Sequence, residues 1–97
     1  EPGYFDANFN LAVVYYNRAA DLIKKANEMD LKTYQKEGKK LEDTAKEGFK
    51  KSLPYFEKAH EINPQDRTVL ETLQTVYSQL RMNDKVAELS KKIEALN

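Results

Sequence analysis

The stretch from residue 55 to residue 66 constrains the fold of this chain most, because it ends one helix and begins another. Apolar residues recur through its first half at helical spacing, at Phe56, Ala59 and Ile62. Asn63-Pro64 then stops the helix, and Asp66 stands where the N-cap of the next helix belongs. The chain therefore divides into a long helical hairpin before this turn and a shorter hairpin after it.

Composition supports helices and excludes several classes of partner. The 97 residues are 40% hydrophobic and 33% charged, with only three glycines, which is typical of exposed helix rather than of sheet or disorder. Sixteen basic residues balance sixteen acidic ones, so we expect no nucleic-acid partner. Cysteine is absent, which excludes disulfides and thiolate metal sites. No apolar run approaches the ~18 residues of a membrane span, so we expect no membrane insertion.

The first hairpin is predicted to contain two long helices. The first, over about residues 7–29, carries an apolar stripe at Ala12, Tyr15, Ala19, Leu22, Ala26 and Met29, widened by Leu11, Val14 and Ile23. The second runs from about residue 33 to residue 62, with Asp30 or Thr33 available as its N-cap. Its inward stripe is Leu41, Ala45, Gly48 or Phe49, Ser52, Phe56, Ala59 and Ile62.

The second hairpin is predicted to contain two short helices. Their stripes are Leu70, Leu73, Tyr77 and Leu80, then Val86, Leu89, Ile93 and Leu96. Between them, Asn83 suits a left-handed conformation and Asp84 suits a cap. The prediction is an all-α chain of four helices, two long and two short.

Two glycines fall inside the second long helix. Each costs about 1 kcal/mol against alanine in a helix interior, so the half that contains Gly38 should be the softer one. Gly48 is expected to offset its cost by letting the alanine-rich first helix approach closely.

The two hairpins share a register. Leu11 and Tyr15 follow Pro2 at the spacings with which Leu73 and Tyr77 follow Pro64, an offset of 62 residues. In this the chain resembles the tetratricopeptide repeat (TPR) family, whose unit is a 34-residue helical hairpin. The matching residues are Leu11, Ala12, Tyr15, Ser52, Phe56, Ala59 and Pro64, then Leu70, Leu73, Tyr77, Val86 and Ile93. The second repeat departs from the pattern, because Gln74 and Arg81 replace small residues and Ser90 replaces an aromatic one.

The resemblance implies a single TPR-like domain over residues 1–97, a fragment of a right-handed solenoid. An extended first repeat would occupy residues 5–63 and a degenerate second repeat residues 64–97. The offset of 62 exceeds one repeat by 28 residues, all between Tyr15 and Ser52. Lengthening both helices equally accounts for them and predicts a projecting antiparallel arm. Because Pro2 falls where a preceding repeat would end, we expect a C-terminal piece of a longer repeat protein.

In the TPR family the first helices of successive repeats line a concave groove that holds peptides. The corresponding positions are Phe9, Asn10, Val13, Tyr16, Asn17, Thr72, Thr75, Ser78 and Gln79. Asn10 and Asn17 could bond a peptide backbone, while Phe9 and Tyr16 either accept an apolar side chain or pack on a neighbouring repeat. These positions include no basic residue, so a clamp for terminal carboxylates is not expected.

Other candidate chemistry is outweighed by simpler structural readings. Glu57-x-x-His60 has the spacing of a di-iron ligand pair, but such a site needs two pairs and the chain has one histidine, so no metal is expected. Residues 32–51 hold seven lysines against four acids, interleaved as on a solvated helix face that could also contact an acidic partner. No nucleophile–base pair or phosphate loop is evident, which predicts no enzyme and no cofactor.

The predicted function is a non-enzymatic scaffold that binds a protein or peptide through its concave face. The rival prediction is a structural element in which the arm pairs with a second copy through its tip residues Met29, Leu31 and Tyr34. A third reading, regulation of an enzymatic domain elsewhere in a longer chain, has less support.

Overall fold

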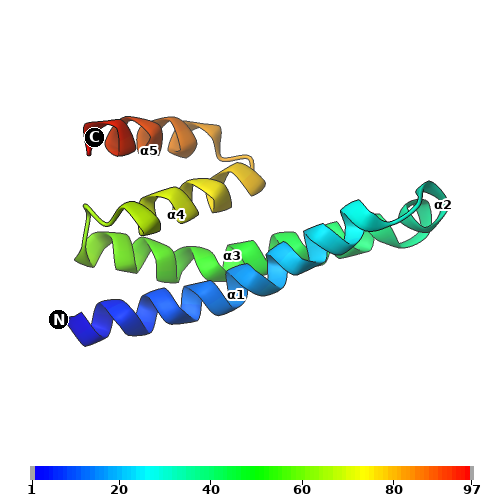
Figure 1. The fold of residues 1–97 in the computed structure, drawn as a ribbon, viewed down its shortest axis with the longest axis horizontal. Coiled ribbons are helices and arrows are strands. Elements are labelled where there is room, and N and C mark those ends of the chain that lie inside the picture. The colour runs from blue at the N-terminus through cyan, green and yellow to red at the C-terminus, as the bar shows by residue number, and fades with distance from the viewer. Residues whose placement is uncertain (1, 97) are drawn as a thin grey trace.

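A computed structural model describes residues 2–96, all in helices and short connections (Figure 1). The elements are α1 (Pro2–Glu28), α2 (Leu31–Thr33), the π-helical turn η1 (Tyr34–Gly38), α3 (Lys39–Ile62), α4 (Arg67–Gln79) and α5 (Asn83–Ala95). Because α2, η1 and α3 follow one another without a gap, they act as a single long helix. The described residues contain no strand, and the all-α prediction of two long and two short helices is confirmed.

The helices lie side by side in the order α1, α3, α4 and α5, each antiparallel to the one before (Figure 1). The start of α1 and the end of α5 lie at one end of the molecule, and α2 lies at the other (Figure 1). The far half of the first hairpin extends beyond α4 and α5 as the sequence predicts (Figure 1). We call residues 19–48 the arm, and the remaining described residues the base.

The base contains a core of large side chains. Those that are fully buried are Phe56, Val69, Leu70, Leu73 and Val76. Tyr77 and Leu89 add to this core, and the Tyr77 hydroxyl donates to Glu57 Oε2 over 2.7 Å. Most predicted inward residues of α3 and α4 in the base are buried, but Ile62 and Leu80 are only half-buried. Val69 and Val76 fall outside the predicted stripe. They are buried because α4 lies between α3 and α5 and is covered on two sides (Figure 1).

Small residues hold the arm together. Its buried positions are Ala19, Ala26, Gly38 and Ala45. A Cβ atom added to Gly48 would lie 3.1 Å from Ala19 Cβ, so the two helices meet almost backbone to backbone. The expected close approach at Gly48 is confirmed.

The arm turns at Met29–Asp30 and returns through a π-helical turn. The Asp30 carboxylate accepts a hydrogen bond of 2.7 Å from the Thr33 backbone N–H, so Asp30, not Thr33, is the N-cap and the helix begins at Leu31. This hydrogen bond lowers the pKa of Asp30. The Tyr34 ring lies over Gly38, where any Cβ would overlap it, and the Tyr34 hydroxyl donates to Glu42 Oε1 over 2.7 Å. Gly38 therefore makes room for an aromatic ring.

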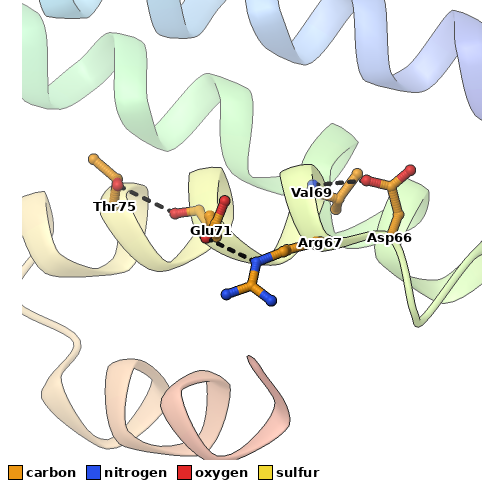
Figure 2. Close-up of polar contacts among 5 residues, drawn as sticks. All are labelled: Asp66, Arg67, Val69, Glu71 and Thr75. Atoms are coloured by element: carbon orange, nitrogen blue, oxygen red, sulfur yellow. Dashed lines mark hydrogen bonds and ion pairs between the residues drawn. The ribbon is translucent and has the colours of Figure 1, made fainter. Parts of the chain in front are cut away.

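Asp66 caps α4 as predicted. Its carboxylate accepts a hydrogen bond of 3.0 Å from the Val69 backbone N–H, as Figure 2 shows. In the next turn Arg67 Nε donates to Glu71 Oε2 over 3.2 Å, and the Thr75 hydroxyl donates to the Glu71 carbonyl (Figure 2). These contacts fix the start of α4 directly after the turn that organises the chain.

The α4–α5 connection differs from the prediction. Arg81, not Asn83, adopts the left-handed conformation, with φ 59°. The Met82 N–H bonds to the Tyr77 carbonyl over 2.8 Å and the Arg81 N–H to the Ser78 carbonyl over 3.0 Å, which is a Schellman motif. Since α4 ends at Gln79 and the chain reverses at Arg81, Asn83 and Asp84 already lie in the first turn of α5, whose N-cap is Met82. The predictions of a left-handed Asn83 and a capping Asp84 are therefore wrong.

The outer side of α1 also differs from the prediction. Leu11 and Val14, expected to widen the inward stripe, are 40% and 48% exposed. The reason is that α1 lies at the edge of the helical layer, with α3 beside it on one side (Figure 1).

Candidate partner-binding site

The predicted concave-face residues of α1 divide into two groups. Phe9, Val13 and Tyr16 are half-buried and pack against the core. The Phe9 ring meets Phe56 edge to face with centroids 6.2 Å apart, and the Tyr16 ring meets Phe49 at 5.7 Å. Asn10 and Asn17 are exposed. The two aromatic side chains therefore bury much of their surface against α3, while the two asparagines face solvent.

The predicted residues of α4 lie near the surface. Thr75, Ser78 and Gln79 are exposed and Thr72 is half-buried. In the layer of helices α3 lies between α1 and α4 (Figure 1), so the predicted face is carried by two helices with a third between them. The structure brings Ser78 and Gln79, but not the asparagines of α1, to the wall of a groove.

This groove lies where the arm passes the end of α4, and we call it the junction groove. Its volume is about 460 Å³. It is lined by Ile23 of α1, by Lys39, Glu42, Asp43, Lys46 and Phe49 of α3, and by Ser78, Gln79 and Arg81 at the end of α4. Ile23 supplies apolar surface, Phe49 closes the groove from beneath and is only 2% exposed, and the other residues supply a polar and charged rim.

The charges of the junction groove are partly satisfied from within. Glu42 accepts the Tyr34 hydroxyl, and this bond raises the pKa of Tyr34. Lys39 Nζ lies 3.9 Å from Asp43 Oδ2, a long and largely exposed pair that contributes little to stability. Within residues 2–96, the side chains of Lys46 and Arg81 have no hydrogen-bond or ion-pair partner. The rim therefore presents two unpaired cations.

A second, shallower groove of about 320 Å³ runs between α4 and α5. It is lined by Gln74, Thr75, Ser78, Gln79 and Val86, so Ser78 and Gln79 border both grooves. Gln74 Nε2 donates to Ser90 Oγ over 2.6 Å. Gln74 and Ser90 are two positions at which the sequence departs from the predicted repeat pattern, and this hydrogen bond links them between α4 and α5.

The arm tip presents two of its three predicted contact residues. Leu31 is 73% exposed and Tyr34 is 36% exposed, whereas Met29 is half-buried. Tyr34 is also tied to Gly38 and Glu42, so only Leu31 is free of contacts that the arm itself needs.

Glu57 and His60 have structural partners on the second hairpin. Glu57 accepts the Tyr77 hydroxyl, and burial together with this bond raises the pKa of Tyr77. His60 Nε2 lies 3.4 Å from Lys92 Nζ, while Nδ1 is buried with no partner within the described part of the chain. Burial and the charge of Lys92 lower the pKa of His60. Over residues 2–96 the structure contains no group of three or more His, Cys, Asp or Glu residues that could hold a metal ion.

The lining of the junction groove was only partly visible in the sequence. The lysine-rich stretch drew attention to Lys39 and Lys46, and the resemblance to Ser78 and Gln79. Nothing in the sequence placed Arg81 beside them, because that contact depends on where α4 stops against the arm.

Within the described residues, no helix has the length and apolar character needed to cross a membrane.

Comparison with known proteins assigns the chain to no family. The chain matches no protein-family model, no curated protein and no solved structure. The resemblance to tetratricopeptide repeats therefore stays a prediction drawn from residue spacing.

Proposed function

We propose that this chain is a non-enzymatic scaffold that binds a segment of a protein or peptide partner. The observation that carries the proposal is the junction groove, an open site of about 460 Å³ where three helices meet, with the apolar side chain of Ile23 among polar and charged side chains. Ser78 and Gln79 extend this surface into the neighbouring groove, so an extended segment could follow α4 from one groove to the other. The resemblance to TPR proteins supports the same role, with the hairpins stacked as part of a right-handed solenoid.

The test is selection of peptides that bind the full chain, followed by obstruction of the surface. Ser78→Arg places a long side chain in both grooves at an exposed position and should abolish binding of the selected peptides. Ala87→Arg is the matched control, because Ala87 is exposed on α5 and lines neither groove. Failure to select any peptide, or equal binding by the two variants, would refute the proposal. Asn17→Arg then reports whether the α1 part of the predicted face contributes.

A second candidate, a structural oligomerisation element, is favoured by the exposed arm tip. Leu31, at 73% exposure, is the most exposed large apolar side chain in the described chain. Light scattering over a concentration series would reveal a dimer, and Leu31→Ser should dissociate it without altering the fold. Tyr34 is unsuitable for this test, because its loss would also disturb Gly38 and Glu42.

A further inference from the structure

We propose that the junction groove binds an acidic peptide segment that carries an apolar side chain. This inference rests on the proposed function and names the chemistry of the partner. The occupant would place its apolar side chain over Ile23, and its carboxylates beside Lys46 and Arg81.

The first argument is the charge balance of the rim. Three cations, Lys39, Lys46 and Arg81, face two carboxylates, Glu42 and Asp43. Each carboxylate already has a partner, through the Tyr34 hydroxyl and through Lys39. The two remaining cations are unpaired across residues 2–96, so an incoming carboxylate can pair with them without breaking an existing contact.

The second argument is the charge close to the groove. Five of its nine lining residues lie within residues 32–51, which carry seven lysines and four acids. The arm as a whole, residues 19–48, holds seven basic and seven acidic residues, so the preference for an acidic segment is local to the rim and acts at short range.

The third argument is the backbone at Arg81. A left-handed position at the end of a helix ordinarily takes glycine, since side chains with a Cβ are disfavoured there. Arg81 adopts φ 59° at this position, and its residue lines the groove. A disfavoured conformation held at the rim of a site supports a role for the side chain that the turn alone does not need.

A nucleic acid fits this groove less well. Phe49, the aromatic residue in the lining, is only 2% exposed and offers no open surface on which a base could stack. Ile23 instead suits contact with an aliphatic side chain, and Lys46 and Arg81 suit carboxylates. A short acidic segment with one apolar side chain offers both.

The experiment measures fluorescence anisotropy of a labelled peptide in which glutamates flank one leucine, titrated with the full chain. The matched probes replace the glutamates by lysines or by glutamines, and a single-stranded oligonucleotide serves as a further probe. The variants are Lys46→Gln and Arg81→Gly. Lys51→Gln is the control, since Lys51 is an exposed lysine of α3 outside the groove.

We expect the acidic peptide to bind more tightly than the other probes and to weaken with salt. Lys46→Gln and Arg81→Gly should each weaken it roughly two- to fivefold, and together about tenfold, while Lys51→Gln leaves it unchanged. Arg81→Gly is informative because glycine suits the turn, so the fold should be at least as stable while the guanidinium is lost.

Three outcomes would overturn the inference: equal binding of the lysine peptide, tighter binding of the oligonucleotide, or an Arg81→Gly variant that binds the acidic peptide as the parent does. If peptides selected against the full chain still bind and are blocked by Ser78→Arg, the scaffold proposal stands and only the acidic specificity fails. If no peptide binds at all, both proposals fail together.

Discussion

The base and the arm of this molecule use opposite kinds of packing. In the base, α3, α4 and α5 enclose large side chains such as Phe56 and Leu73, which are at most 1% exposed. In the arm, two helices meet over alanines and glycines, and the contact between Ala19 and Gly48 brings the backbones close together. Buried apolar area stabilises roughly in proportion to its size, so the base contributes most of the free energy of unfolding. The arm gains dispersion contacts but little area, and it should open first.

The largest predicted effect tests the base. Phe56→Ala removes a fully buried ring that contacts Phe9 and Tyr16, and it should lower the free energy of unfolding by about 3–5 kcal/mol. Urea unfolding followed by circular dichroism measures the loss. Leu31→Ala at the exposed arm tip is the control and should change stability by less than about 0.5 kcal/mol. Similar losses from the two variants would contradict the division into base and arm.

The next prediction tests the arm. Gly48→Leu forces a large side chain against Ala19 and should cost about 1–3 kcal/mol. Native-state hydrogen exchange should show faster exchange of arm amides with little change in α4. Gly48→Ala is the milder companion, because about 1 kcal/mol of helix propensity offsets a contact that is only slightly too short. Equal loss of protection in α4 and in the arm would mean that the two regions unfold as one unit.

The difference between the regions also explains what could be predicted from the sequence. The sequence predicted Asp66 as a cap, Asp30 as one of two candidate caps, and a close approach of Gly48 to the alanine-rich first helix, and all three are confirmed. The chain reversal at Arg81 and the π-helical turn at Tyr34–Gly38 are also local, but they use arrangements that the residue types there do not favour. At the reversal, the Met82 N–H bonds to the Tyr77 carbonyl, and in the π-helical turn the Tyr34 ring lies over Gly38. Neither arrangement can be predicted from the residue types alone.

The same distinction applies to the candidate site. The lysines of the arm and the polar residues of α4 were visible as separate patterns. Both sets of residues line the junction groove because the arm passes the end of α4. The 28 extra residues of the first hairpin predicted an arm, but not which of its residues would lie beside α4. Arg81 lines the same groove because its backbone adopts a left-handed conformation. Glycine is the usual residue in that conformation, so residue preferences did not predict it for Arg81.

A matched pair of caps gives the third prediction. Asp66 accepts the Val69 N–H in the base, and Asp30 accepts the Thr33 N–H at the arm tip, with similar geometry. Asp66→Ala should lower global stability by about 1 kcal/mol. Asp30→Ala should instead fray α2 and leave the urea midpoint nearly unchanged, because the tip opens locally before the base unfolds. Hydrogen exchange at α2 and urea unfolding together separate the two effects, and equal shifts of the urea midpoint would contradict this difference.

The smallest predicted effect is a dependence of the stability of the base on pH. The only histidine of the chain, His60, lies in the base. A neutral ring that accepts from the Lys92 ammonium at Nε2 carries its hydrogen on the buried Nδ1. Protonation replaces that contact by repulsion within a partly buried site. Burial and Lys92 accordingly hold the pKa of His60 below its ordinary value of 6.5.

As pH falls through 6.5, the unfolded chain binds this proton before the folded chain does, and stability declines. The loss begins at the ordinary pKa and is complete below the lowered one. His60→Gln, which cannot titrate, should remove this slope from urea unfolding measured between about pH 7.5 and pH 5.5, above the range in which carboxylates titrate. Exchange of the arm amides should be insensitive to His60 over the same range, once corrected for the intrinsic effect of pH. A slope that survives in His60→Gln would place the titrating group elsewhere, and an arm that loosens in step with His60 would show that the base transmits its loss of stability to the arm.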